Sequence, residues 1–417
     1  MKNIKIIILF LFLLALCPTH ATTYTMLTPL DTANLPNISM SSVGDGMVRN
    51  YFSTDLLWKT SHKILLRNNF SASSVNRLLG ALNKITNKHM VSISCTYWSK
   101  DSHGDSLLVS GKIYLPKERN LRGIIIANHY TIASDKEAPS NFYQMDCIFA
   151  MKGYAVIMPD YVGYGISRNH IHPYLHWRSA AQTAIDLLDC IPQLLDKYGY
   201  TYPTDIIVTG YSQGAAVALG VVRLIEEQIQ NNLQQQSFNW SIRKLYAGAG
   251  PYDPAVTYKY CVEKDSMGIP GAIPMIIMGL SDAYELNLNL DDFLTDSLAP
   301  QCYEWIMSKE LTVDQISLMM GANKMSMLMK PQALAFSNAL SEQLYTVLKE
   351  NSNVGYDLKA SAYFFHSLED DMVPFVNSEA LSRHLSANEN ITFDFGYYGS
   401  HKEGALLFMQ HVYKDLK

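Results

Sequence analysis

The sequence is poor in charge and lacks the compositional signs of several protein classes. Only 17% of the 417 residues are charged, and the formal net charge is −5. This balance gives no electrostatic reason to bind nucleic acid or an anionic membrane surface. The chain shows no internal repeat, no low-complexity linker and no disordered tail. With 48% hydrophobic residues, it is expected to bury a sizeable core.

Long hydrophobic runs are absent beyond the N-terminus. Lys2 and Lys5 precede an apolar stretch over residues 6–16, and Ala21 stands at a plausible cleavage point. Because this stretch is too short to span a bilayer, residues 1–21 are predicted to be a signal peptide, and the protein is expected to be secreted or periplasmic. Acylation of Cys17, giving a lipoprotein, is the alternative. No later stretch predicts a stable membrane span.

Cysteines are few, and their number after the predicted signal peptide is odd. They are Cys95, Cys147, Cys190, Cys261 and Cys302. In an exported protein at least one of them must stay free. The one disulfide expected is Cys261 with Cys302, since both lie in the same segment, residues 254–345.

The most informative motif is Gly210-Tyr211-Ser212-Gln213-Gly214, between a β-branched apolar strand and an Ala/Val/Leu-rich helix. A serine on such a sharp turn needs glycine two residues to either side, because neighbouring elements come close enough to clash with a Cβ. The turn places the serine at a helix N-terminus, where backbone N–H groups can stabilise negative charge. The pattern resembles the nucleophile elbow of α/β-hydrolases, and an ordinary surface turn is the alternative.

The resemblance implies an acid and a base further along the chain, in the order Ser, Asp or Glu, His. Residues 360–366 read as a late buried strand, and 366–374 resemble the H-G-x-x-D-x-x-V-P stretch of the family. That match makes Asp370 the acid, with Asp371 as the alternative, although Ser367 replaces the usual glycine. A strand over 391–396 leads to His401, just before a C-terminal helix over 403–414. His401 is the expected base, and a surface loop histidine is the alternative.

The oxyanion donors are expected from two places. An apolar strand over 123–128 ends at His129 and resembles the His-Gly end of the third strand in this fold. The residue after that histidine usually supplies one donor, and the residue after the nucleophile supplies the other. Gln213 is therefore expected to act together with Tyr130 or Thr131. Because Tyr130 replaces glycine, either its backbone or its phenol is a candidate donor.

Further motifs extend the resemblance over residues 91–417. They are the P-D-Y-x-G-Y-G turn at 159–165, H-P-Y-L at 172–175 and G-P-Y-D at 250–253. Together with G-Y-S-Q-G they resemble secreted α/β-hydrolase esterases of the secretory-lipase group. The resemblance implies an α/β fold, with a mostly parallel sheet flanked by helices and a helical cap inserted after the sixth strand. It implies a small-molecule or lipid-like ester substrate and no cofactor.

The chain divides accordingly into a core and an insertion. Residues 22–90 are expected to form a helical segment packed on the core, and residues 91–253 and 346–417 form the core. Strands over 91–98 and 107–115 are expected as its antiparallel edge. Residues 254–345 form the cap, because a connection of about ninety residues is far too long for a simple loop between strands.

The cap is rich in methionine, a flexible side chain suited to adaptable apolar surfaces. Met319 and Met320 are expected to bind substrate, with packing inside the cap as the alternative. Tyr211 and His172, the latter at the mouth of the cleft, are also expected to bind substrate.

Three other interpretations are open from the residues. His170, His172 and His176 lie close in sequence, but no carboxylate or cysteine completes a ligand set, so no metal site is expected. Asp186 precedes the serine and is expected to be structural. Alternatives to an esterase are a serine peptidase of the prolyl-oligopeptidase type, a deacetylase acting on a polysaccharide, and a non-catalytic binding protein.

Overall fold

The computed structural model describes residues 25–27, 90–141, 144–230, 240–336 and 338–416. The predicted signal peptide, including Cys17, lies outside the described residues. So does nearly all of the helical segment expected over 22–90. The described parts of that segment, Thr25–Leu27 and Met90, lie in strands and not in a helix.

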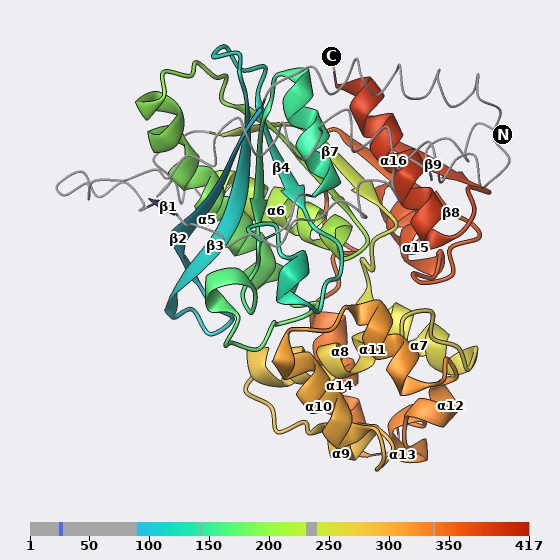
Figure 1. Cartoon of the computed structure of the whole chain (residues 1–417). Helices are drawn as coiled ribbons and strands as arrows, with labels where there is room; N and C mark the ends of the chain where they lie inside the picture. Colours follow the sequence, from blue (N-terminus) through green and yellow to red (C-terminus); the bar gives the residue numbers. More distant parts are fainter. Residues whose placement is uncertain (1–24, 28–89, 142–143, 231–239, 337, 417) are drawn as a thin grey trace, which may run out of the picture.

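The described chain folds around one mixed sheet, in the order β1-β2-β3-β5-β4-β6-β7-β8-β9 (Figure 1). Strands β4 to β9 are parallel to one another, and β3 is antiparallel to both β2 and β5. The strands are β1 (Thr25–Leu27), β2 (Met90–Lys100), β3 (Ser106–Pro116), β4 (Ile124–Asn128), β5 (Ala155–Pro159), β6 (Asp205–Tyr211), β7 (Ser241–Gly248), β8 (Ala362–Ser367) and β9 (Ile391–Gly396).

The expected antiparallel pair is present and longer than predicted. Strand β2 pairs with β3 from Met90 opposite Pro116 to Lys100 opposite Ser106. Strand β1 pairs in parallel with the other side of β2, so β2 is not the outermost strand. This strand was not predicted, because Thr25–Leu27 is too short to show a strand pattern.

Helices cover both faces of the sheet. Alternate side chains of a strand point to opposite faces, and in β4 the side chains of Ile124 and Ile126 pack with α5 and α6, whereas Ile125 and Ala127 pack with η2 and α16. All four are completely buried. These core helices are η1 (Asp135–Glu137), η2 (Met145–Lys152), η3 (Gly165–Ser167), α5 (Trp177–Lys197), α6 (Gln213–Gln230), α15 (Val376–Leu385) and α16 (His401–Asp415). The α/β-hydrolase fold predicted from the sequence is thus confirmed.

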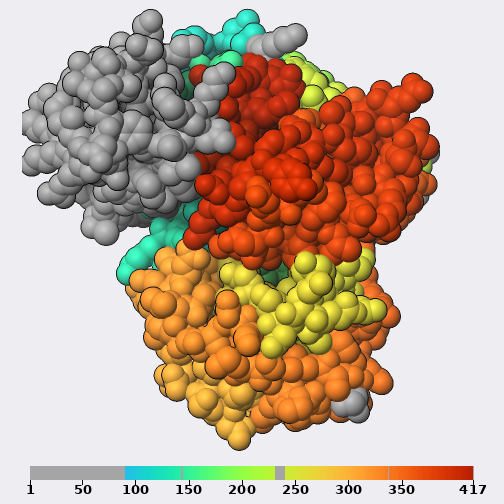
Figure 2. Space-filling model, turned by 90° about the vertical axis from the view of Figure 1, so that its right-hand side faces the viewer, coloured from blue at the N-terminus to red at the C-terminus, as the bar shows by residue number. Residues whose placement is uncertain are grey.

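The insertion after β7 forms a separate helical lobe, visible below the sheet in Figure 1 and below the C-terminal part of the chain in Figure 2. Its core is built largely from methionine, leucine and isoleucine side chains. The lobe contains α7 (Pro254–Glu263), α8 (Ala272–Ala283), α9 (Leu290–Phe293), α10 (Ala299–Ser308), α11 (Val313–Met320), α12 (Met325–Leu328), α13 (Pro331–Leu334) and α14 (Ala339–Glu350). Helix α14 extends past residue 345, where the cap was predicted to end, and its Val347 and Leu348 belong to the cap core.

The predicted disulfide between Cys261 and Cys302 is wrong. Cys261 lies on α7 and Cys302 on α10, and both are buried free thiols in the cap core. Sharing an insertion does not bring two Cα atoms within the narrow distance that a disulfide requires. A buried cysteine without a partner packs as a small apolar side chain.

Candidate active site

Ser212 occupies the sharp turn between β6 and α6. Its φ of 58° lies in the left-handed region, which is unfavourable for any residue except glycine. The flanking glycines have a steric reason: a Cβ on Gly210 would lie 2.0 Å from the carbonyl oxygen of Gly214, and one on Gly214 would lie 2.1 Å from that of Asn128. The turn can therefore form only with glycine at both positions. It leaves Ser212 half-buried at the start of a helix of 18 residues.

Asp370 and His401 come together from two separate loops. Asp370 follows β8, His401 is the first residue of α16, and Nδ1 of His401 lies 2.7 Å from Oδ2 of Asp370. The other carboxylate oxygen, Oδ1, accepts the backbone N–H groups of Met372 and Val373 at 2.9 and 2.8 Å. The acid is thus held by a turn that forms around it.

The environment of Asp370 keeps its carboxylate ionised. Its side chain is fully buried, and burial favours the neutral acid, but hydrogen bonds from His366 and His401 outweigh that effect and hold the pKa of Asp370 well below its usual range. A buried carboxylate in this state can orient the imidazole and stabilise its protonated form.

Asp371, the alternative acid, also contacts His401 but through a different atom. Its Oδ1 accepts the backbone N–H of His401 at 2.9 Å. It therefore holds the first turn of α16, whereas Asp370 holds the ring. The two neighbouring carboxylates therefore position the same histidine through different atoms.

A second histidine, His366, contacts the carboxylate of Asp370, and this contact was not predicted from the sequence. His366, at the end of β8, is completely buried, and its Nε2 lies 3.3 Å from Oδ2 of Asp370 and 3.0 Å from the carbonyl oxygen of Val373. Its Nδ1 lies 2.6 Å from Oγ of Ser378. The sequence feature that could have identified His366 is its position four residues before Asp370, at the end of an apolar strand.

Tyr211 links the serine to the histidine loop. Its hydroxyl donates to the carbonyl oxygen of His401 at 2.8 Å, and the two rings are 4.9 Å apart between centroids. The phenol hydroxyl is thus hydrogen-bonded to His401, and the substrate contact expected from the sequence stays a prediction. No hydrogen bond joins Ser212 to His401 among the described residues. Such contacts commonly form only once substrate is bound.

The oxyanion candidate Gln213 is the first residue of α6. Its backbone N–H is one of the four at a helix start that have no partner within the helix. Its buried side chain contacts His172, with the amide Nε2 3.0 Å from Nε2 of the imidazole. Nδ1 of His172 lies 2.7 Å from the carbonyl oxygen of Val162, so a proton on Nδ1 satisfies both contacts.

The sequence predicted His172 at the mouth of the cleft, but the structure buries it. It is 5% exposed. Burial, together with the charge of Lys309, lowers the pKa of His172 to about 3, so the ring is neutral and can accept from Gln213. Gly163 makes this burial possible, because a Cβ there would lie 2.7 Å from the backbone of His172.

The other oxyanion candidates follow β4. Tyr130 is 37% exposed, and its carbonyl oxygen lies 2.7 Å from Nδ1 of His129. Thr131 is buried, and its hydroxyl is hydrogen-bonded to that of Tyr174 at 2.8 Å. The hydroxyl of Thr131 is therefore already engaged, which favours a backbone donor from this loop.

The methionines of the cap fall into two groups. Met320 is 5% exposed and belongs to the cap core, while Met319 is 46% exposed. Met320 is therefore part of the internal packing of the cap, the alternative given above. Met275 and Met278, on α8, also belong to the cap core, and in addition they line a small cavity that His172 lines too. These two face the core, because α8 packs its Gly279 against the backbone of residues 172–174.

The remaining candidates have structural contacts. Asp186 accepts from Ser99 Oγ at 2.6 Å and from Gln182 Nε2 at 2.7 Å, as expected for a structural residue. His176 is hydrogen-bonded to Ser179 at 3.0 Å. In the part of the chain that the structure describes, no three His, Cys, Asp or Glu side chains are grouped so as to hold a metal ion. None of the described helices has the length and hydropathy to cross a membrane.

No protein-family model and no curated protein sequence matches the chain. Its structure is similar to that of a Legionella pneumophila protein whose assignment as a hydrolase is itself an inference, with a TM-score of 0.69 and 17% identity over 79% of this chain and 89% of that one. It is similar to the rice cell wall degrading esterase LipA of Xanthomonas oryzae, with a TM-score of 0.66, 19% identity and the same coverage. It is also similar to lipase A of Candida antarctica, with a TM-score of 0.54 and 14% identity over 79% of each chain. At these identities, the similarity establishes the fold.

Proposed function

We propose that the chain is a secreted serine hydrolase that cleaves carboxylic esters, of the lipase or esterase kind, through Ser212, His401 and Asp370. The observation that carries the proposal is the 2.7 Å contact between His401 and an ionised, buried Asp370, on the same sheet edge as the strained Ser212. The esterases and lipase among the similar structures support the choice of substrate class. The motifs of the secretory-lipase group and the predicted signal peptide support secretion.

The proposed reaction follows from the roles of the three side chains. His401 takes the proton of Ser212 through Nε2 as Oγ attacks the ester carbonyl, and Asp370 stabilises the imidazolium at Nδ1. The backbone N–H of Gln213, with one from Tyr130 or Thr131, stabilises the oxyanion. The imidazolium then protonates the leaving alcohol. Water, activated by the same histidine, releases the acid from the acyl-enzyme.

The test is an activity screen with nitrophenyl esters of graded acyl chain length. The unmodified protein is expected to hydrolyse at least one ester, and an organophosphate is expected to label Ser212 alone. Ser212→Ala should abolish both activity and labelling. If the unmodified protein leaves every ester intact, or if Ser212→Ala retains activity, the proposal is wrong.

A second candidate is an esterase that removes short acyl groups from a polymeric carrier. Its support is the similarity to an esterase that degrades a plant cell wall and the small size of the cavity beside His172. A strong preference for acetyl esters, with no gain from longer chains, would favour this candidate over a lipase.

A further inference from the structure

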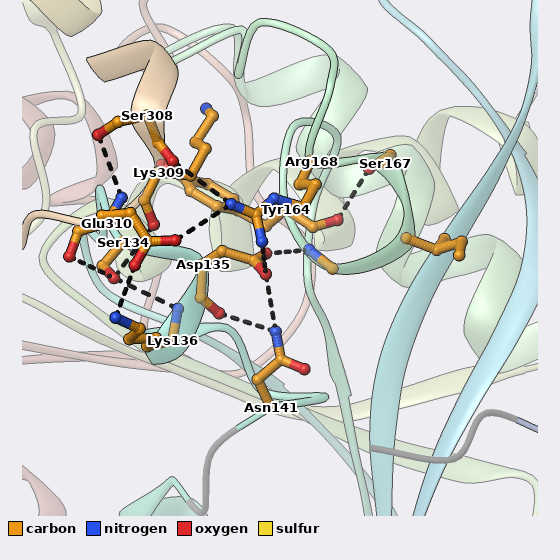
Figure 3. Close-up of polar contacts among 12 residues, drawn as sticks. Ser134, Asp135, Lys136, Asn141, Tyr164, Ser167, Arg168, Ser308, Lys309 and Glu310 are labelled. Atoms are coloured by element: carbon orange, nitrogen blue, oxygen red, sulfur yellow. Dashed lines mark hydrogen bonds and ion pairs between the residues drawn. The ribbon is translucent and has the colours of Figure 1, made fainter. Parts of the chain in front are cut away.

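Lys309 places an ammonium group inside the junction between cap and core. It follows α10 in the cap, and only 2% of its surface is exposed. The backbone around it docks onto the loop after β4: the N–H of Asp135 donates to the carbonyl oxygen of Lys309 at 2.8 Å. Figure 3 shows these contacts and draws no hydrogen bond or ion pair at the amine of Lys309.

The charged groups around Lys309 are paired with one another and not with its amine. The carboxylate of Asp135 accepts the backbone N–H of Gly165 at 2.6 Å and the amide of Asn141 at 3.0 Å, and it lies 3.5 Å from Arg168. Glu310 pairs with Lys136 at 2.6 Å and with Arg168 at 3.4 Å. No carboxylate of the described residues lies within 4 Å of the Lys309 amine.

What Lys309 does contact is an aromatic face. Its Nζ lies 4.8 Å from the centroid of the Tyr164 ring, which attracts a cation only weakly compared with a carboxylate. Burial of an ammonium group without a full set of hydrogen bonds is unfavourable. The Asp135 carboxylate favours the charged form of Lys309 electrostatically, but among the described residues no carboxylate forms an ion pair with the amine, so its direct anionic contact is left open.

The backbone of Lys309 adds to this cost. Its φ is 57°, in the left-handed region, at the C-cap of α10. Glycine adopts this conformation without strain and is the common residue at such a position. A lysine here is thus unfavourable both in its backbone and in its side chain.

Lys309 lines a cavity close to the candidate site. The cavity is lined by apolar side chains of cap and core together with Tyr164, His172 and Lys309; the apolar residues are Ala133, Ile171, Met275, Met278 and Ile306. His172 contacts the side chain of Gln213, the residue after Ser212. The wall therefore combines one cation, one neutral imidazole and an apolar surface that methionine can adapt.

We propose that Lys309 binds a carboxylate on the substrate, so that the preferred ester is one whose acyl part ends in a carboxylate. This inference rests on the proposed function, and it adds a substrate class to it. The methylene groups between ester and carboxylate would lie against Met275 and Met278. Because the cavity has room for a group of only a few atoms, the carboxylate reaches the amine when these flexible side chains move.

The experiment compares matched esters. The monomethyl esters of adipic, pimelic and suberic acid carry a carboxylate, and methyl hexanoate, heptanoate and octanoate are their neutral counterparts. Hydrolysis is followed by titration of released acid, with unmodified protein, Lys309→Met, Lys309→Arg and Lys324→Met. Lys324→Met is the matched control, because Lys324 is an exposed lysine of the same cap.

The unmodified protein should prefer at least one carboxylate-bearing ester over its neutral match. In Lys309→Met the ratio of the two kcat/KM values should fall by roughly 10- to 100-fold, as for loss of a charged hydrogen bond. Lys309→Arg should retain most of the ratio, and Lys324→Met all of it. An unchanged ratio in Lys309→Met would overturn the inference.

The unmodified protein alone also decides the question if Lys309→Met does not fold. A preference for the neutral ester at every chain length would overturn the inference without any variant. Hydrolysis of neutral esters that depends on Ser212, with no effect of the carboxylate, would leave the proposed function standing and remove only the inference. If no methyl ester of either series is hydrolysed while a nitrophenyl ester is, only the inference fails; if the nitrophenyl esters are left intact as well, the proposed function itself fails.

Discussion

Nδ1 of His401 lies 2.7 Å from Oδ2 of Asp370, while the backbone N–H of the same histidine donates to Asp371 at 2.9 Å. Two consecutive carboxylates thus hold one histidine, one by its ring and the other by its main chain. This division separates a candidate catalytic contact from a structural one within a single turn.

Ser212 and His401 should act as one unit. Replacing either with alanine is expected to lower kcat by on the order of 10³- to 10⁶-fold, and the double variant should lose little more, because each residue is useless without the other. Steady-state kinetics with a nitrophenyl ester measures this. Losses that multiply in the double variant would contradict a shared role.

Asp370→Asn should damage activity far more than Asp371→Asn. An amide at 370 cannot stabilise the imidazolium and favours the wrong tautomer, so kcat should fall by on the order of 10³- to 10⁴-fold. An amide at 371 still offers an oxygen to the backbone of His401, and kcat should change by less than about 10-fold, with a lower melting temperature. The reverse ranking would move the acid to Asp371.

His366 should act on the reaction through Asp370. In His366→Asn the carboxylate loses one donor and becomes more basic, so it should stabilise the protonated form of His401 more strongly. The acid limb of the pH profile of kcat/KM should then move to higher pH, with little change in KM. His384→Asn is the control, since His384 is an exposed histidine on α15. An unchanged pH profile would make His366 purely structural.

Met278 should influence acyl chain length, whereas Met319 should not. Met278 lines the cavity beside His172, and Met319 is 46% exposed on α11. Met278→Ala enlarges the cavity, so esters with longer chains should gain, at about 0.8 kcal/mol per additional buried CH₂. Acetate esters should be nearly unaffected. The same chain-length profile in Met278→Ala and Met319→Ala would show that the methionines serve only cap packing.

Cys261 and Cys302 should both be free thiols. Alkylation of the denatured protein before reduction, followed by peptide mass spectrometry, is expected to label both residues completely. Addition of a reductant should leave the melting temperature unchanged, because no covalent crosslink constrains the cap. A peptide pair linked by a disulfide between the two would contradict the structure.

The local features of the candidate site could be derived from the sequence because short-range sterics decide them. Gly210 and Gly214 are needed because a Cβ at either position of so tight a turn would clash with the neighbouring backbone. The match to the family's H-G-x-x-D-x-x-V-P stretch and its chain order assigned Asp370 and His401, each after an apolar strand. The fold class was implied by the resemblance of these motifs to those of α/β-hydrolases.

Contacts between distant segments were decided only by the tertiary structure. The environment of Lys309 depends on Tyr164 and Asp135, and that of His172 on Gly163 and Gln213, none of them predicted to be neighbours. The state of Cys261 and Cys302 depended on how the cap helices pack. Burial and pairing of side chains arise from long-range packing, which residue spacing does not encode, so the sequence by itself determined the motifs and the structure determined which groups meet.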